Sequence, residues 1–392
     1  MKSLKYMLIL KTPETEQFVE NMNAFLQKRL RSEYERADTD GKSYIGNILD
    51  NGLIGSVNYS QFRNLEIKPP VKKSVRQMDV YLVHSFCGYD GKSYDPNIGY
   101  MKLFLINDAL KRAKASEIIN VLPHIPYQRQ DRKDEPRVPI SAKVMATLTE
   151  SSGGKHFDGI LTSDMHSSQQ QGFYEVAVDT LECAPLFMNY LAKQGFDAAE
   201  TAVVSPDAGG AGRLRAYAKR FGLKRAILDK YRERAGEAEV THLIGEVGPT
   251  CIIIDDIVDS GNTIVAGAEK LREAGARDIY VFATHWIATD GAEQKLRNAG
   301  IKVVTTDSIP RSPEYNAANK DFLTQLTLAP IFADAIFRSQ IGESLRPLYE
   351  PEYVKELYSN FYGKDAATTE KNTLHTRRFP EKSEPQQASP QA

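Results

Sequence analysis

The sequence predicts an α/β protein made of two layered domains of similar design, each a mostly parallel sheet flanked by helices. Short apolar runs alternate with amphipathic segments over most of the 392 residues, a rhythm typical of parallel β-α units. At about 150 residues per domain, this length fits two or three domains. With 41% hydrophobic and 26% charged residues, the composition is ordinary for a soluble globular protein.

The first half opens with an amphipathic segment at residues 12–30, where Pro13 suits the first turn of a helix. Residues 79–85, DVYLVHS, form an apolar run typical of a buried strand, and residues 101–115 place apolar side chains at helical spacing. The alternation then predicts a strand, a helix and a strand at residues 118–123, 141–151 and 157–162.

The second half repeats this rhythm. Residues 251–254 predict a strand that runs straight into a helix ending at Gly275, and a further helix ends at Gly300. The other predicted elements are strands at residues 201–205, 225–229, 278–283 and 301–305, and a helix at residues 211–221.

The domain limits follow from these elements. We expect an N-terminal domain at residues 1–183, a second domain at residues 184–335 and a helical segment at residues 336–362. Residues 363–392 are polar and rich in Pro, Gln and Ser. Because such a segment buries little apolar surface, we expect a disordered tail there.

Charge and cysteine content exclude several classes of function. Fifty Lys and Arg against 51 Asp and Glu give a net charge of −1, which favours neither nucleic acid nor an anionic membrane as a partner. The three cysteines, Cys87, Cys183 and Cys251, have neither metal-ligand spacing nor a disulfide pattern. Without a membrane-length apolar run or a secretory signal, the chain is expected to be cytoplasmic.

The most informative segment is CIIIDDIVDSGNTIVAGAEKL, at residues 251–271. A predicted strand ends in two carboxylates, Asp255 and Asp256, and the loop at residues 259–263 opens a helix. Backbone N–H groups of small residues at a helix N-terminus bind phosphate, and carboxylates accept hydrogen bonds from sugar hydroxyls. The pattern therefore predicts a site for a phosphorylated sugar. The alternative is a solvated turn in which Asp and Ser only cap the helix.

This loop resembles the phosphoribosyl-diphosphate loop of the type I phosphoribosyltransferases, a family with several activities. Four more segments narrow the resemblance, namely PHIPYQRQDRKDEPRVPISAK at 123–143, SDMHSSQQQGFYEV at 163–176, VVSPDAGGAGRLRAYA at 203–218 and AILDKYRER at 226–234. In this order they resemble the ribose-phosphate pyrophosphokinases, over about residues 54–358. A plain phosphoribosyltransferase has no counterpart of the RQDRK and DMH segments.

The resemblance implies two phosphoribosyltransferase-like domains, the first on the ATP side and the second on the ribose 5-phosphate side. It implies a transferase of nucleotide biosynthesis, a ribose-phosphate diphosphokinase. In its reaction the C1 hydroxyl of ribose 5-phosphate attacks the β-phosphorus of ATP, and diphosphate is transferred whole as AMP leaves. Mg²⁺ is the implied cofactor. The implied assembly is a homo-oligomer of dimers that form a hexamer.

The resemblance also assigns residues. For ATP these are Arg129, Gln130, Asp131 and His166, with Phe62, Asn64 and Glu66 reaching a neighbouring subunit's adenine pocket. The metal-associated positions are His166, Asp207 and Asp164. The ribose hydroxyls match Asp255 and Asp256, and the 5-phosphate matches Asp259, Ser260, Gly261, Asn262 and Thr263. The catalytic cations match Lys230 and Arg232.

One departure from the family concerns Asn262, where the family usually has Gly. Because Asn tolerates left-handed backbone geometry, we expect the phosphate-binding loop to survive. Two alternatives remain open, a non-catalytic regulatory relative and a phosphoribosyltransferase that acts on a base. The sequence leaves undecided whether inorganic phosphate activates or ADP inhibits.

Overall fold

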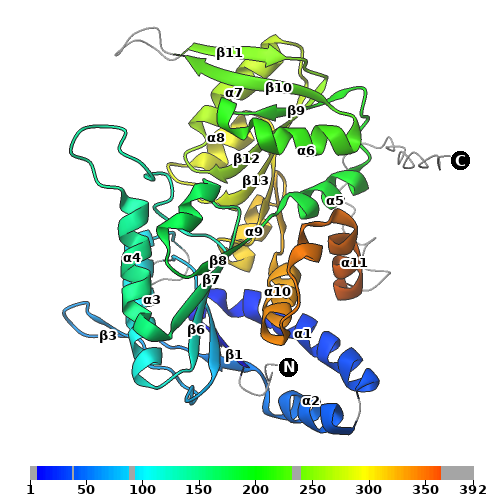
Figure 1. The fold of residues 1–392 in the computed structure, drawn as a ribbon. Helices are drawn as coiled ribbons and strands as arrows, with labels where there is room; N and C mark the ends of the chain where they lie inside the picture. Colours follow the sequence, from blue (N-terminus) through cyan, green and yellow to red (C-terminus); the bar gives the residue numbers. More distant parts are fainter. Residues whose placement is uncertain (1–6, 38, 88–92, 232–239, 363–392) are drawn as a thin grey trace, which may run out of the picture.

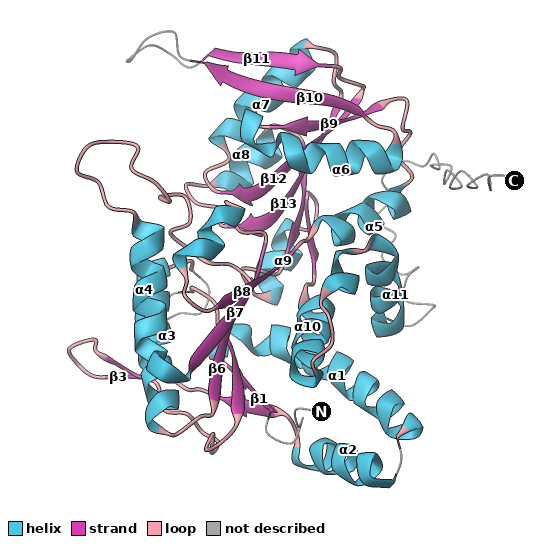
Figure 2. Ribbon diagram, viewed as in Figure 1, coloured by secondary structure: helices cyan, strands magenta, loops and turns pink. Residues whose placement is uncertain are grey.

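The computed structural model describes residues 7–37, 39–87, 93–231 and 240–362, and it has one large sheet in each half of the chain (Figures 1 and 2). The N-terminal sheet has the order β2-β1-β5-β6-β7-β8, and its described strands pair in parallel. These strands are β1 (Met7–Lys11), β2 (Ile54–Ser56), β5 (Asp79–Val83), β6 (Glu117–Leu122), β7 (Phe157–Ser163) and β8 (Ala177–Leu181).

The C-terminal sheet has the order β11-β10-β9-β12-β13-β14-β15, with only the β10–β11 pair antiparallel among its described strands. Its strands are β9 (Thr201–Ser205), β10 (Lys224–Tyr231), β11 (Val240–Gly245), β12 (Thr250–Val258), β13 (Asp278–Trp286), β14 (Ile301–Thr306) and β15 (Leu323–Leu326). Two mostly parallel sheets flanked by helices confirm the predicted fold class.

Helices cover both sheets, as parallel connections require. In the N-terminal half they are α1 (Glu16–Arg36), α2 (Thr39–Asn51), α3 (Pro96–Arg112) and α4 (Ser141–Gly153). In the C-terminal half they are α5 (Ala184–Gln194), α6 (Ala211–Phe221), α7 (Asn262–Glu273), α8 (Ala292–Asn298), α9 (Pro313–Asn319), α10 (Ala329–Ile341) and α11 (Pro351–Tyr362). Within the described ranges, no helix is long and apolar enough to cross a membrane.

The halves share one apolar core around α10. This helix is buried over most of its length and packs on α1, from the other end of the chain, and on α11 (Figure 1). The core joins Phe18 of α1 to Phe332 of α10 in an edge-to-face ring contact with centroids 5.8 Å apart. The predicted limits at residues 183 and 335 stay predictions, and the predicted tail lies outside the described residues.

Several predicted boundaries differ from the structure, among them the end of β13 at Trp286 and not at 283, and two of the differences have local reasons. Helix α3 begins at Pro96, not at residue 101, because the Asp95 carboxylate accepts hydrogen bonds from the N–H groups of Asn97 and Ile98 and so caps the helix. Strand β12 continues to Val258, not 254, because its pairing with β13 extends to that residue.

That second difference shapes the site. The pairing of β12 with its other neighbour, β9, stops at Ile253. Asp255 and Asp256 therefore lie inside the strand, at the point where one of its two edges has become open. A carboxylate at this position has a strand on one side and the loop that follows β9 on the other.

A buried ion pair holds the central helix to its neighbours. On α10, Arg338 Nε donates to Asp334 Oδ2 at 2.6 Å, and the Tyr353 hydroxyl of α11 also donates to that oxygen at 2.8 Å. Asp334 is fully buried and Arg338 is 8% exposed. Removal of one member of such a pair leaves an uncompensated charge in the core.

We predict that Asp334→Ala lowers the free energy of unfolding by about 2 kcal/mol or more, because Arg338 then keeps only Glu343, which is 47% exposed, as a carboxylate partner at 2.9 Å. The matched control is Asp108→Ala on α3, which breaks an Asp–Arg pair of the same spacing and the same 2.6 Å distance to Arg112, 76% exposed. That control is expected to cost less than about 0.5 kcal/mol. Denaturant titration of both variants measures the difference, and equal losses would contradict the prediction.

Candidate active site

The larger of two adjoining cavities lies where the carboxyl ends of the two sheets face one another, the usual place for a ligand in parallel α/β folds. It has a volume of about 410 Å³. The C-terminal half supplies Pro206, Asp207, Gly209, Arg213, Asp255, Asp256, Ile257, Asp259, Ser260, Gly261, Thr263 and Ile264. The N-terminal half supplies Arg129 and His166. Most of the predicted sugar-site residues are thus brought together.

The loop after β12 has the geometry of an anion site. Gly261 caps α7 with φ 74°, a left-handed conformation that costs glycine little. The N–H groups at the start of α7 face a cavity edge formed by Ser260, Gly261 and Thr263. Asn262 is the first helical residue and Gly261 takes the left-handed conformation, so the loop does not need that conformation at position 262.

The side chain of Asn262 contributes in another way. Its Oδ1 accepts a hydrogen bond from Lys295 Nζ of α8 at 2.9 Å, and the same Nζ lies 3.3 Å from the Ser260 carbonyl oxygen. Lys295 thus joins α8 to the loop through two contacts and places a positive charge beside the loop. Glycine at position 262 would lack this side-chain contact.

Asp256 is the most heavily engaged carboxylate of the site. It is 5% exposed, its Oδ2 lies 2.8 Å from His166 Nδ1, and its Oδ1 accepts a hydrogen bond from Arg213 at 3.2 Å. Burial alone would raise the pKa of Asp256, but the hydrogen bond with His166 and the charge of Arg213 lower that pKa well below its ordinary value. The same hydrogen bond raises the pKa of His166.

Asp255 has the opposite electrostatics. Burial, followed by the hydrogen bond and charge of its neighbour Asp256, raises the pKa of Asp255 well above its ordinary value. Arg213 lies 3.8 Å from it, farther than from Asp256. The pKa values of these two adjacent carboxyl groups therefore shift in opposite directions, because Asp256 has the closer cations.

Sequence reasoning missed Arg213. It lies in the third position of α6, after the loop that contains Asp207. An Arg in the first turn of a helix is unfavourable toward the helix dipole. That placement, in a helix that follows an acidic loop, is the signal in the sequence that could have found it.

Arg129 reaches across from the N-terminal half. Its Nη1 lies 2.7 Å from Asp259 Oδ2, so a predicted ATP residue contacts a predicted phosphate-loop residue. Gln130 instead donates to Asp134 and to the Arg132 carbonyl oxygen within its own loop.

Asp131 also lies away from the large cavity, and its carboxylate accepts a hydrogen bond from Gln170 at 3.3 Å. A residue that sequence reasoning missed, Gln128, supports His166. Its side-chain oxygen accepts from the His166 backbone N–H at 2.7 Å.

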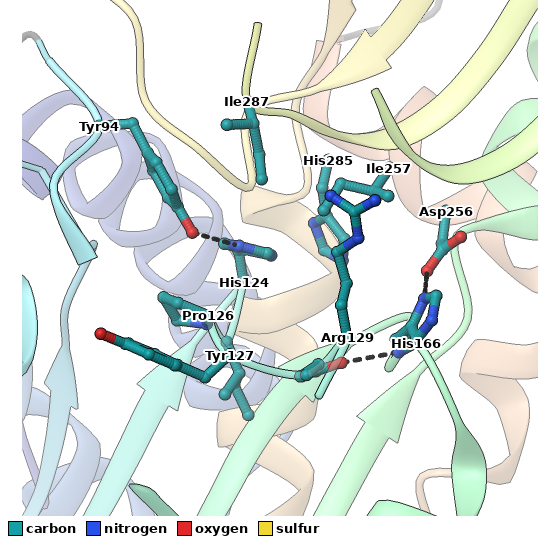
Figure 3. A pocket seen from close by; sticks show the side chains of 12 residues that line it. Tyr94, His124, Pro126, Tyr127, Arg129, His166, Asp256, Ile257, His285 and Ile287 are labelled. Carbon is teal, nitrogen blue, oxygen red and sulfur yellow. Dashed lines mark hydrogen bonds and ion pairs between the residues drawn. The ribbon is translucent and has the colours of Figure 1, made fainter. Parts of the chain in front are cut away.

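A smaller cavity of about 110 Å³ adjoins the large one and shares Arg129, His166 and Asp256 with it (Figure 3). Its other walls include Tyr94 and His124, whose hydroxyl and Nε2 lie 3.1 Å apart. Burial lowers the pKa of His124, so the ring is neutral at neutral pH.

Two of the three predicted metal residues line the large cavity, and the third does not. His166 and Asp207 both line the large cavity, and Asp207 Oδ1 accepts the N–H of Gly210 at 3.0 Å. Asp164 is not among the described residues that line either cavity, and its carboxylate accepts hydrogen bonds from Thr284 and from the Cys183 N–H. Within the described residues, no group of three or more His, Cys, Asp or Glu could hold a metal ion by protein ligands alone.

None of the remaining predicted residues is among the described residues that line these two cavities. Phe62, Asn64 and Glu66 occupy the hairpin of β3 (Ser60–Gln61) and β4 (Ile67–Lys68), which projects beside the N-terminal sheet (Figure 1). Phe62 is 55% exposed. Lys230 lies in β10 with its backbone paired to Thr241 of β11, and Arg232 lies outside the described residues.

Comparisons with known proteins agree with this arrangement. The family model for the N-terminal domain of ribose phosphate pyrophosphokinase matches residues 36–153, and that for the phosphoribosyl synthetase-associated domain matches residues 235–350. The ribose-phosphate pyrophosphokinase of Bradyrhizobium diazoefficiens is 41% identical over 293 residues, which cover 74% of this chain and 88% of that protein. The Pasteurella multocida protein of the same name is 39% identical over 300 residues, 76% and 91% of the two chains.

A solved structure gives the same result. The phosphoribosylpyrophosphate synthetase of Mycobacterium smegmatis superposes with a TM-score of 0.69 and 29% identity, covering 86% of this chain and 99% of that one. Sequence and fold therefore agree over most of the molecule. The chain belongs to the ribose-phosphate pyrophosphokinase family, and it is an enzyme with the activity of a ribose-phosphate diphosphokinase.

Proposed function

We propose that the 410 Å³ cavity is where ribose 5-phosphate receives diphosphate from ATP. The observation that carries this proposal is the meeting of the phosphate-loop geometry with Asp255 and Asp256 in one cavity that also contains Arg129 and His166. The sugar side comes from the second half of the chain and the nucleotide side from the first. A reaction between two bound substrates requires such a shared cavity.

On the sugar side, the 5-phosphate binds at the N-terminus of α7. Backbone N–H groups, the helix dipole and the Ser260 and Thr263 hydroxyls supply the attraction, with Asp259, Gly261 and Asn262 completing the loop. Asp256 and Asp255 accept hydrogen bonds from the ribose hydroxyls. Because its pKa is raised, Asp255 can also be protonated and donate a hydrogen bond. The pair can therefore bind a hydroxyl that donates and a hydroxyl that accepts.

On the nucleotide side, Arg129 and His166 meet the phosphates of ATP. The raised pKa of His166 favours a positive ring, which attracts phosphate oxygens. Gln130 and Asp131 are proposed to act near the base. Phe62, Asn64 and Glu66 are proposed to reach the adenine pocket of a neighbouring copy, within dimers that form a hexamer, and the exposure of Phe62 supports this.

The proposed metal is Mg²⁺, near Asp207 and His166. Mg²⁺ prefers oxygen ligands and keeps several waters, so one carboxylate plus substrate phosphates suffices. The Asp207 carboxylate lines the cavity and fits this donor set, while imidazole is a poor direct ligand and His166 would act through water. Bound there, Mg²⁺ would neutralise phosphate charge. Asp164 is left out of this proposed donor set, because both of its carboxylate oxygens accept hydrogen bonds from protein groups.

Catalysis then depends on positioning and on cations that meet the moving charge. The proposed cations are Lys230, near the end of β10, and Arg232, which lies outside the described residues. No general base is assigned. The cytoplasmic location expected from the sequence stays part of this proposal.

The direct test measures AMP formed from ATP, with and without ribose 5-phosphate. The proposed activity gives one AMP per ribose 5-phosphate consumed and little AMP without it. A regulatory relative would form none. A phosphoribosyltransferase would instead consume phosphoribosyl diphosphate when a base is added, an outcome that would contradict the proposal.

The sugar assignment predicts a selective loss. Replacing both carboxylates, as in Asp255→Asn with Asp256→Asn, should raise the KM for ribose 5-phosphate at least about tenfold, the scale of one lost charged hydrogen bond. ATP binding should weaken less than ribose 5-phosphate binding, because Arg129 is unchanged and the amide oxygen of Asn at position 256 can still accept a hydrogen bond from His166. Calorimetry with each substrate checks this, and lost ATP binding with intact sugar binding would reverse the assignment.

The catalytic assignment predicts an effect on kcat rather than KM. Loss of one charge-stabilising donor costs ~3–4 kcal/mol, roughly 10²–10³ in rate. Lys230→Ala should therefore lower kcat at least ~10²-fold and keep both KM values within about threefold. Arg232→Ala should show a milder loss, because Arg234 lies near enough in sequence to substitute. A raised KM with kcat unchanged would make Lys230 a ground-state binding residue.

The His166–Asp256 pair predicts a pH dependence of stability in the substrate-free protein. Because folding raises the pKa of His166, its protonated form stabilises the fold fully below about pH 6.5, and this contribution is lost as pH rises through the raised value. Thermal unfolding from pH 6 to 9 should show this decline in the wild type. His166→Gln should lack that component, so identical pH profiles would contradict it.

A further inference from the structure

A second link between the two halves lies at Asp164, two residues before His166. Asp164 directly follows β7 of the N-terminal sheet. Its Oδ2 accepts a hydrogen bond from the hydroxyl of Thr284, on β13 of the C-terminal sheet, and its Oδ1 accepts the Cys183 N–H at 3.2 Å. Both carboxylate oxygens are therefore engaged with protein donors.

The backbone of Asp164 is tied to the same strand. His285 Nε2 lies 3.2 Å from the Asp164 carbonyl oxygen, and because a carbonyl only accepts, Nε2 carries the proton. Burial lowers the pKa of His285, which keeps its ring neutral. Thr284 and His285 are 1% and 3% exposed, so water competes little for these hydrogen bonds.

The turn that these contacts hold is a constrained one. Asp164 has φ 33°, in the left-handed region that a residue with a side chain rarely adopts. Such a conformation persists when its surroundings fix it. The turn leads to His166, whose Nδ1 meets Asp256 across the cavity at 2.8 Å.

We infer that Asp164 is a positioning residue that, with Thr284 as its partner, fixes the separation of the nucleotide half and the sugar half. The inference rests on the proposed transfer between those halves. In such a reaction the attacking and accepting atoms must lie about 3–3.5 Å apart, and a misplacement of about 1 Å can cost roughly 10²-fold in rate. Asp164 thus acts through the distance between substrates and does not touch them.

The primary variant is Thr284→Val, which keeps the shape and removes the hydroxyl. We expect kcat to fall about tenfold or more, since the halves lose their fixed separation. The KM values for ATP and ribose 5-phosphate should stay within threefold, because each substrate's contacts remain. Thr284→Ser keeps the hydroxyl and should restore kcat to within twofold of wild type.

The matched control is Thr306→Val. The Thr306 hydroxyl of β14 donates to the Thr284 carbonyl oxygen at 2.8 Å, a buried hydrogen bond within the C-terminal half. Its loss should lower the Tm and leave kcat within twofold. A fall in kcat from Thr284→Val but not from Thr306→Val separates positioning from general destabilisation.

Asp164→Asn tests the link from its other side, since one accepting oxygen becomes an amide donor. Combined with Thr284→Val, it should lower kcat no further than the stronger single variant, because both remove one interaction. The Mg²⁺ concentration that gives half-maximal rate should match wild type in every variant. Asp164→Asn also decides the matter if Thr284→Val fails to fold.

Three outcomes would overturn the inference. The first is full kcat in folded Thr284→Val, and the second is a double variant whose loss of kcat is the product of the two single losses. The third is a changed Mg²⁺ requirement in Asp164→Asn alone, which would make Asp164 a metal ligand. These outcomes are distinct from failure of the proposed function. If the wild type forms no AMP from ATP and ribose 5-phosphate, the proposed function fails first.

Discussion

The contact on which the site depends is the one between His166 and Asp256. One residue follows β7 of the first sheet and the other lies within β12 of the second, and their side chains meet at 2.8 Å. This contact is possible because β12 extends beyond the end of its neighbour β9, which leaves Asp256 beside an open edge of the strand. In the proposed reaction each half supplies one side of the cavity, and this contact joins the two sides.

The same contact explains why two adjacent carboxylates differ. Asp256 is ionised because His166 and Arg213 lie on either side of it, whereas burial beside that negative charge raises the pKa of Asp255. The site thus contains one carboxylate whose pKa is lowered, Asp256, and one carboxyl group whose pKa is raised, Asp255. Polyhydroxyl recognition benefits from this difference, because a sugar hydroxyl both donates and accepts.

Local sequence patterns predicted much of the fold and part of the candidate site. The predicted limits of β9 and α6 match the structure. The apolar run of the strand ends at Ser205 and the helix ends just before Gly222, and both signals lie in the local sequence. Arg213 and Gln128 were missed, since their partners lie in distant segments and residue spacing holds no information on such contacts. The contact of Asn262 with Lys295 was also not predicted, because Lys295 lies 33 residues away on α8.

The central claim is that phosphorylated sugar and nucleotide bind at opposite sides of one cavity joined through His166 and Asp256. A crystal structure with ribose 5-phosphate, Mg²⁺ and a non-hydrolysable ATP analogue tests it most directly. The account predicts the 5-phosphate on the backbone N–H groups at residues 260–263, the C1 hydroxyl facing the β-phosphorus, and Arg129 released from Asp259 to contact the nucleotide. Nucleotide phosphates on that loop, with the sugar beside Arg129, would contradict it.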